Sequence, residues 1–127
     1  MKYLYHKLLV ILFLPISIYA SDVYYCVEDD ATGFNPKENY AVTRFVGNKF
    51  KIMIDFKQNM VQSKDLYFQS YNDPKCVAGP ESLNCINTLG MTFIINKTTL
   101  KFYKSAMYNP GRSTDSVVIA RGSCEKF

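Results

Sequence analysis

The chain has 127 residues, of which 48% are hydrophobic, 15% aromatic and 20% charged, so it is long enough for one compact domain and too apolar to be disordered. Its formal charge is +4, which falls to +2 once Lys2 and Lys7 of an apolar N-terminal segment are set aside. That balance is too weak to predict nucleic acid as a partner. The single histidine, His6, lies in the same segment, so residues 21–127 contain neither histidine nor tryptophan.

Residues 1–20 have the pattern of a cleaved signal peptide. Lys2, His6 and Lys7 form a charged start, residues 8–14 form an apolar run, and Ala20 supplies the small residue before the cut. The run is too short to cross a bilayer, which needs about 20 apolar residues. An uncleaved anchor or a buried N-terminal helix is the alternative. We therefore expect a single domain, residues 21–127, that is exported to the periplasm or the medium and has no transmembrane segment.

Export would place the four cysteines, Cys26, Cys76, Cys85 and Cys124, in a compartment where disulfides form and persist. Three pairings are possible, and we favour Cys26 with Cys124, which joins the two ends of the domain, and Cys76 with Cys85. A zinc site is the alternative, but the chain has no CxxC motif and no histidine after residue 20. We expect two structural disulfides and no metal or other cofactor.

Apolar residues recur at every second position through most of the domain, as a half-buried sheet requires. The clearest case is 49–57, where Phe50, Ile52, Ile54 and Phe56 fall on one face and all the polar residues fall on the other with Met53. The preceding run, 40–46, is also β-prone. Because Gly47-Asn48 stands between these runs, the sequence predicts a two-residue hairpin turn there. Further strands are expected at 22–27, 61–68, 83–87, 91–95, 100–108 and 116–121.

About eight short strands with short connections predict an all-β fold, a small antiparallel meander that curls into a barrel or a sandwich. No helical stripe lasts for three turns, and at most a short helix is expected near 36–39 or 80–83. Loops able to vary are expected at 69–82 and 109–115. A bridge between Cys26 and Cys124 would bring the first and last strands together, which suits closure of a barrel.

Residues 21–127 give little support to catalysis. Ser-His-Asp and Cys-His mechanisms need a histidine base, and oxidised cysteines supply no thiolate. The remaining enzymatic alternatives are a hydrolase that uses two carboxylates, such as any two among Glu28, Asp29, Asp30 and Asp55, and a serine activated by a lysine. The acidic run could also bind calcium, but its spacing does not match an EF-hand. We expect a polar loop there, with Gly33 supplying the bend, and we assign no catalytic residue.

Tyrosines and lysines alternate along several of the expected strands. A tyrosine offers apolar area with a polar tip, so these side chains could stack on sugars or bind a protein, although most tyrosines in strands are wall residues. Strand lysines are superficially typical of a nucleic-acid-binding sheet, but more commonly they maintain solubility and prevent edge pairing. The residues are Tyr24, Tyr40, Tyr67, Tyr71, Tyr103 and Tyr108, and Lys49, Lys51, Lys57, Lys64, Lys101 and Lys104.

Several short motifs together resemble a group of small secreted bacterial proteins for which no activity is known. The motifs are Tyr24-x-Cys26, Gly33-Phe34, the strand from Phe50 to Phe56, the hairpin from Phe93 to Phe102, and Gly122-x-Cys124-x-x-Phe127. The resemblance covers nearly all of residues 21–127 and implies export and the two terminal cysteines. A looser resemblance, to periplasmic inhibitors of chicken-type lysozyme, rests on Tyr-x-Cys. Their Ser-Gly-x-x-Tyr loop is absent here, so that resemblance implies no functional residue.

These observations predict a non-enzymatic, periplasmic or secreted β-barrel that binds a protein or a small ligand at one barrel end or along an exposed face. A small-molecule carrier of the lipocalin type is one alternative, and it requires an interior cavity. The carboxylate hydrolase is the other. The row of phenylalanine and isoleucine side chains in 49–57 predicts a filled core, which disfavours the carrier.

Overall fold

The computed structural model describes residues 21–63, 74–88, 90–106 and 116–127. They form nine strands and one short 3-10 helix, η1 (Pro36–Glu38). The predicted signal peptide, 1–20, lies outside the described residues. The strands are β1 (Asp22–Asn35), β2 (Ala41–Phe45), β3 (Lys49–Asp55), β4 (Met60–Gln62), β5 (Lys75–Ala78), β6 (Ser82–Ile86), β7 (Thr92–Asn96), β8 (Lys101–Ala106) and β9 (Val117–Lys126).

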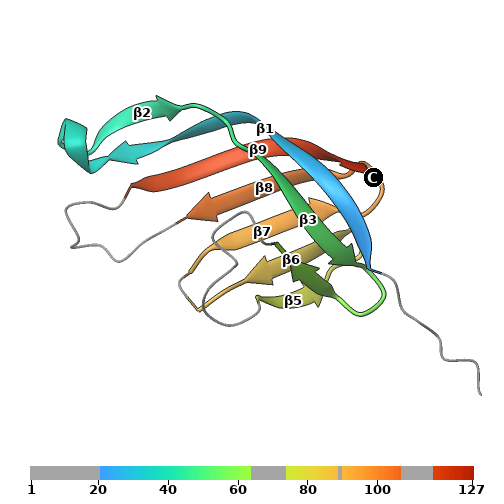
Figure 1. The fold of residues 1–127 in the computed structure, drawn as a ribbon. Helices are drawn as coiled ribbons and strands as arrows, with labels where there is room; N and C mark the ends of the chain where they lie inside the picture. The colour runs from blue at the N-terminus through green and yellow to red at the C-terminus, as the bar shows by residue number, and fades with distance from the viewer. Residues whose placement is uncertain (1–20, 64–73, 89, 107–115) are drawn as a thin grey trace, which may run out of the picture.

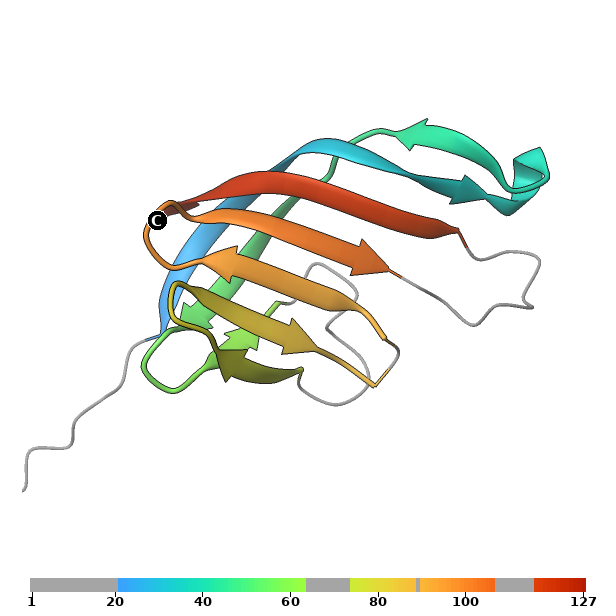
Figure 2. The same cartoon turned by 180° about the vertical axis from the view of Figure 1, so that it is seen from behind.

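The strands form one antiparallel sheet that curls until its two ends nearly meet (Figure 1, Figure 2). The strand order is β4-β3-β1-β9-β8-β7-β6-β5, and β2 pairs with the remaining length of β1. β4 approaches β5, so the sheet almost closes into a barrel. The expected all-β fold is confirmed, and of the two expected architectures the chain adopts the barrel.

The barrel interior is filled by the apolar residues of alternate strand positions. Phe50, Phe93 and Phe102 meet at its centre, with ring centroids 5.4 to 6.4 Å apart. Such edge-to-face and stacked pairs add to the stability gained from apolar burial. The predicted inward face of β3 is confirmed, because Phe50, Ile52 and Ile54 are all buried. The rest of this core is Tyr24, Cys26, Val61, Leu83, Cys85, Ile95 and Cys124.

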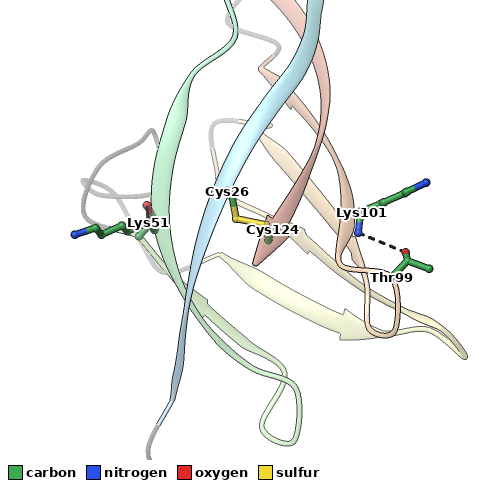
Figure 3. The surroundings of a disulfide bond; sticks show 6 residues. Cys26, Lys51, Thr99, Lys101 and Cys124 are labelled. Carbon is green, nitrogen blue, oxygen red and sulfur yellow. Dashed lines mark hydrogen bonds between the residues drawn. A yellow bond between two sulfur atoms is a disulfide. The ribbon is translucent and has the colours of Figure 1, made fainter. Parts of the chain in front are cut away.

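Both favoured disulfides are present. Cys26 on β1 lies directly opposite Cys124 on β9, and their bond faces the interior between these strands (Figure 3). Cys76 on β5 lies opposite Cys85 on β6 and is bonded to it. No cysteine of the described residues is free. The first bond joins the first and last strands at the middle of the sheet, and the second fixes one of its edges.

The predicted hairpin of 40–46 and 49–57 is wrong. β2 and β3 do not pair with each other but lie end to end along the same edge of β1. The chain runs straight through Gly47 and Asn48 instead of turning back, and the Glu28 N–H donates to the Asn48 carbonyl at 2.9 Å. Gly47 is needed for close approach, because a Cβ there would collide with the Glu28 carbonyl oxygen.

The acidic run that was expected to form a loop is part of β1, which is therefore much longer than predicted. A β-bulge between Glu28 and Asp30 lets the strand continue to Asn35, and Gly33 pairs within it rather than making a bend. Beyond the bulge, β1 pairs with β2 and with the start of β9 and projects past the barrel (Figure 1, Figure 2). We call this projection, β2 with residues 31–35 and 117–120, the flange.

Three smaller predictions also change. The expected loop at 69–82 contains β5, whose four residues are too few to show a clear alternation. The helix considered at 80–83 is absent because β6 begins at Ser82, whereas the one at 36–39 is present as η1. β9 extends to Lys126, five residues past its predicted end. The loop expected at 109–115, and the distal parts of the strands predicted at 61–68 and 100–108, lie outside the described residues.

Candidate functional site

The outer face of β2, β1, β9, β8 and β7 carries a series of exposed apolar side chains. Val42 on β2 is 75% exposed, Ile119 on β9 is 56% exposed, and Tyr103 on β8 is 61% exposed. Phe34 lies opposite Val42, and Ile94 on β7 lies opposite Tyr103, so the series spans five neighbouring strands. We call these five residues the apolar row. Exposed apolar groups that continue across several strands mark interaction surfaces more often than isolated ones do.

Two arginines share one aspartate at the centre of this row. Arg121 on β9 donates from Nε and Nη2 to Asp30 Oδ2 at 3.2 and 2.8 Å, and Arg44 on β2 donates from Nη2 to Asp30 Oδ1. The hydrogen bonds from Arg121, and then those from Arg44, hold the pKa of Asp30 below its usual value. The two guanidinium groups thus share the Asp30 carboxylate, and the neighbouring Asp29 also attracts Arg121 electrostatically.

A shallow hollow of about 200 Å³ opens beside this cluster. Asp30 and Thr32 of β1, Tyr103 of β8, and Ile119, Ala120 and Arg121 of β9 line it. Asp30 and Thr32 share the outer face with Tyr103 because the bulge in β1 has already reversed which residues point outward. The hollow therefore combines an apolar wall with fixed charges at its rim, as protein-binding surfaces commonly do.

The interior face of the same region holds a buried ion pair. Lys104 on β8 donates to Glu28 Oε1, and the lysine and carboxylate side chains are 7% and 2% exposed. Glu28 Oε2 also accepts the Asn48 N–H at 3.0 Å, and Lys104 Nζ lies 5.3 Å from the Phe50 ring centroid. Lys104 was expected to be an exposed strand lysine, and that prediction is wrong. β8 turns this residue inward, and Glu28 supplies the counter-charge.

The four acids considered for a carboxylate hydrolase do not share a site. Glu28 faces the interior, whereas Asp30 lies on the outer face and is bound by arginines. Asp29 is exposed in the bulge between them. Asp55 lies at the end of β3, where its Oδ1 accepts the N–H groups of Lys57 and Gln58, both at 2.9 Å. Each carboxylate thus has a separate setting, and the outer-face cluster adjoins the hollow described above.

The tyrosines and lysines singled out in the sequence are divided among several settings. Tyr24 is buried in the core, and burial raises the pKa of its phenol, as does the nearby Asp22. Tyr40 is exposed at the turn into β2, and Tyr103 belongs to the apolar row. The exposed lysines are Lys49, Lys51, Lys57 and Lys101, while Tyr67, Tyr71, Tyr108 and Lys64 lie outside the described residues.

Sequence reasoning missed Arg44, Arg121 and Ile119. β9 presents large residues outward while Ala120 and Gly122 face inward, which reverses the usual rule that the larger apolar residues lie inside. The available signal was the alternation of small residues, Ala120 and Gly122, with the larger Ile119 and Arg121. The sequence alone does not say which of these two sets faces the interior, so it could not identify Ile119 and Arg121 as surface residues.

The comparisons with other proteins add no family assignment. The chain matches no protein-family model, no curated protein and no solved structure. Within the described ranges, no group of three or more histidine, cysteine, aspartate or glutamate residues is placed to hold a metal ion. The same ranges contain no helix with the length and apolarity needed to span a membrane.

Proposed function

We propose that this protein is an exported, non-enzymatic binding module that holds a partner protein on the outer face that carries the apolar row. The observation that carries the proposal is the apolar row, which has the Arg44–Asp30–Arg121 cluster at its centre and lies on a disulfide-bonded sheet. Tyrosine and arginine are the residue types that contribute most to protein–protein binding, especially when they surround a small hollow.

Export is supported by the two disulfides, which persist in oxidising compartments and tend to be reduced in the cytosol. Mass spectrometry of the exported, non-reduced protein tests this part of the proposal. We expect a chain that begins at Ser21 and carries no free thiol. A full-length chain, or one with alkylatable cysteines, would argue against export.

The alternative of a small-molecule carrier has less support. A carrier needs interior space, whereas Phe50, Phe93 and Phe102 occupy the centre of the described barrel. The hollow beside the Asp30 cluster is on the outer face and is open to solvent. Such a hollow suits a side chain of a protein partner better than an enclosed apolar molecule.

Site-specific photo-cross-linking tests the binding surface. A photoreactive phenylalanine analogue at Ile119 should give one discrete adduct with a protein of the exported fraction, and Tyr103→Lys should remove that adduct. Val77 on β5 is a matched control, because it is a similarly exposed apolar residue on a distant strand. Equal labelling from both positions, or an adduct that survives Tyr103→Lys, would contradict the proposed surface.

A further inference from the structure

The free edge of the flange offers a second kind of contact. Among the described strands, β2 pairs only with β1, and neither view shows a labelled strand beyond it (Figure 1, Figure 2). An unpaired strand edge is a template for pairing with another chain. Proteins usually protect such edges, yet β2 carries Val42 on its outward face, followed by the exposed Val46.

The backbone groups that face this edge can be identified. Thr32 Oγ1 donates to the Thr43 carbonyl at 3.2 Å, so the carbonyl of Thr43 is directed toward β1. Successive residues of a strand direct their N–H and C=O groups to opposite edges. Val42 and Arg44 therefore present theirs to the open side, where they can form two pairs of ladder hydrogen bonds with an added strand.

The side chains along the edge define what the added strand must carry. Val42, Arg44 and Val46 occupy alternate positions, so their side chains would lie beside those of an added strand at the same spacing. Arg44 is 80% exposed, and it shares the Asp30 carboxylate with Arg121. An acidic side chain opposite Arg44 would pair with its exposed guanidinium group, and apolar side chains would suit the two valines.

We infer that the β2 edge binds an extended segment of the partner protein with the pattern apolar-x-acidic-x-apolar. The inference rests on the proposed function and adds the chemistry of the partner. Ladder hydrogen bonds supply affinity in this mode of binding, and alternate side chains supply specificity. A second copy of this chain is a poorer occupant, because pairing β2 with its own copy brings two Arg44 side chains close together.

A capped synthetic peptide, Thr-Val-Thr-Glu-Thr-Val-Thr, is the probe. At saturation it should slow hydrogen exchange of the Val42 and Arg44 amides by about tenfold or more, because both become hydrogen-bonded. The Thr43 amide, which already faces β1, should change much less. A matched peptide with lysine in place of glutamate should bind about tenfold more weakly.

Two variants identify the contact. Val42→Pro removes the outward N–H and should abolish peptide binding, whereas Val42→Thr keeps that N–H and a β-branched side chain and should bind the peptide. If proline disrupts the flange, Arg44→Glu supplies the test. This variant should reverse the charge preference, so that the lysine peptide binds better than the glutamate peptide. The inference would be overturned if the peptide left the hydrogen-exchange rates of the Val42 and Arg44 amides unchanged. It would also be overturned if Arg44→Glu still bound the glutamate peptide better than the lysine peptide.

The same experiments separate this inference from the proposed function. Suppose that the analogue at Ile119 cross-links a partner and Tyr103→Lys removes that adduct, while the peptide does not slow hydrogen exchange of the Val42 and Arg44 amides. The proposed outer surface would then hold, and the inference about the β2 edge would fail. If the protein instead dimerises in sedimentation analysis and its own dimer protects the β2 amides, a second copy is the occupant and the inference is wrong.

Discussion

At the scale of single residues, the Glu28–Lys104 pair shows how one buried charge depends on another. Burying an unpaired ion costs several kcal/mol, whereas a paired and hydrogen-bonded ion costs far less. Glu28 satisfies both carboxylate oxygens, one with Lys104 and one with the Asn48 N–H. It thereby links β1 to β8 and fixes the passage from β2 to β3.

Lys104→Met should lower the free energy of unfolding by about 3 to 5 kcal/mol, because it leaves the Glu28 carboxylate buried without its counter-ion. Combining it with Glu28→Gln should restore most of that loss, since neither side chain of the pair then carries a charge. Lys101→Met, on the exposed face of the same strand, should change the stability by less than about 0.5 kcal/mol. Urea unfolding measures all three, and a Lys104→Met protein as stable as the wild type would contradict the buried pair.

Asp30 gives a prediction about pH. Its pKa is lowered in the folded protein, first by Arg121 and then by Arg44, so its charge stabilises the fold above the unfolded-state pKa of about 3.9. That contribution is lost as the pH falls through the lower, folded-state pKa. The wild type should therefore have a modestly higher free energy of unfolding than Asp30→Asn, by a constant amount from pH 5 to 8. This difference between the two proteins should shrink below pH 4. A difference that grows in acid would contradict this assignment.

At the scale of the elements, β1 organises the molecule because it is long enough to pair with two strands on one edge. β3 occupies its first half and β2 its second, while β9 follows nearly its full length on the other edge. The bulge after Glu28 reverses the inward and outward positions at the point where β1 leaves the barrel. This reversal places Asp30 outside, where the arginines reach it.

The junction of β2 and β3 can be tested with alanine substitutions at two glycines. Gly47→Ala should lower the stability by about 1 to 3 kcal/mol, because the new Cβ would press on the backbone of Glu28. Gly79→Ala is the control. The atom nearest to a Cβ added at residue 79 is the Ser82 side-chain oxygen, at 2.9 Å, and this oxygen can rotate away. Denaturant unfolding compares the two variants, and equal losses would argue against a close approach at Gly47.

The positions of most elements follow from the sequence, but their partners do not. Alternation in 49–57 assigns Phe50, Ile52 and Ile54 to the interior because the period of a strand determines its faces. It does not say which strand lies beside it, and so the hairpin through Gly47 and Asn48 was wrong. β5 was missed because Lys75–Ala78 is short and depends on its pairing with β6 and its disulfide.

At the scale of the whole molecule, the two disulfides close loops of very different length. Cys26 and Cys124 are separated by 98 positions, and Cys76 and Cys85 by 9. On the chain-entropy model, the long loop contributes about 4.7 kcal/mol and the short one about 2.6 kcal/mol. Each is a substantial fraction of the 5 to 15 kcal/mol that stabilises a domain of this size.

Replacing Cys26 and Cys124 together by alanine should therefore destabilise the protein more than replacing Cys76 and Cys85 together. Urea unfolding of the two double variants, beside the reduced and alkylated wild type, measures the order. The reduced protein should be the least stable of all, with a melting temperature many degrees lower. A larger loss from the short bridge, or an unchanged melting curve on reduction, would contradict this ranking.

The sequence by itself determined the all-β class and the inward face of β3, because these depend on local periodicity. It favoured the cysteine pairs that the structure contains, but it left all three pairings possible. Only the tertiary structure decided that Asp30, Arg44 and Arg121 meet, since they come from three strands whose adjacency no local pattern encodes. It also decided that Lys104 is inside and that the outer face of the flange is apolar. The physical reason is that a strand's alternation fixes its two faces, whereas pairing across the sheet determines which face meets the core and which meets water.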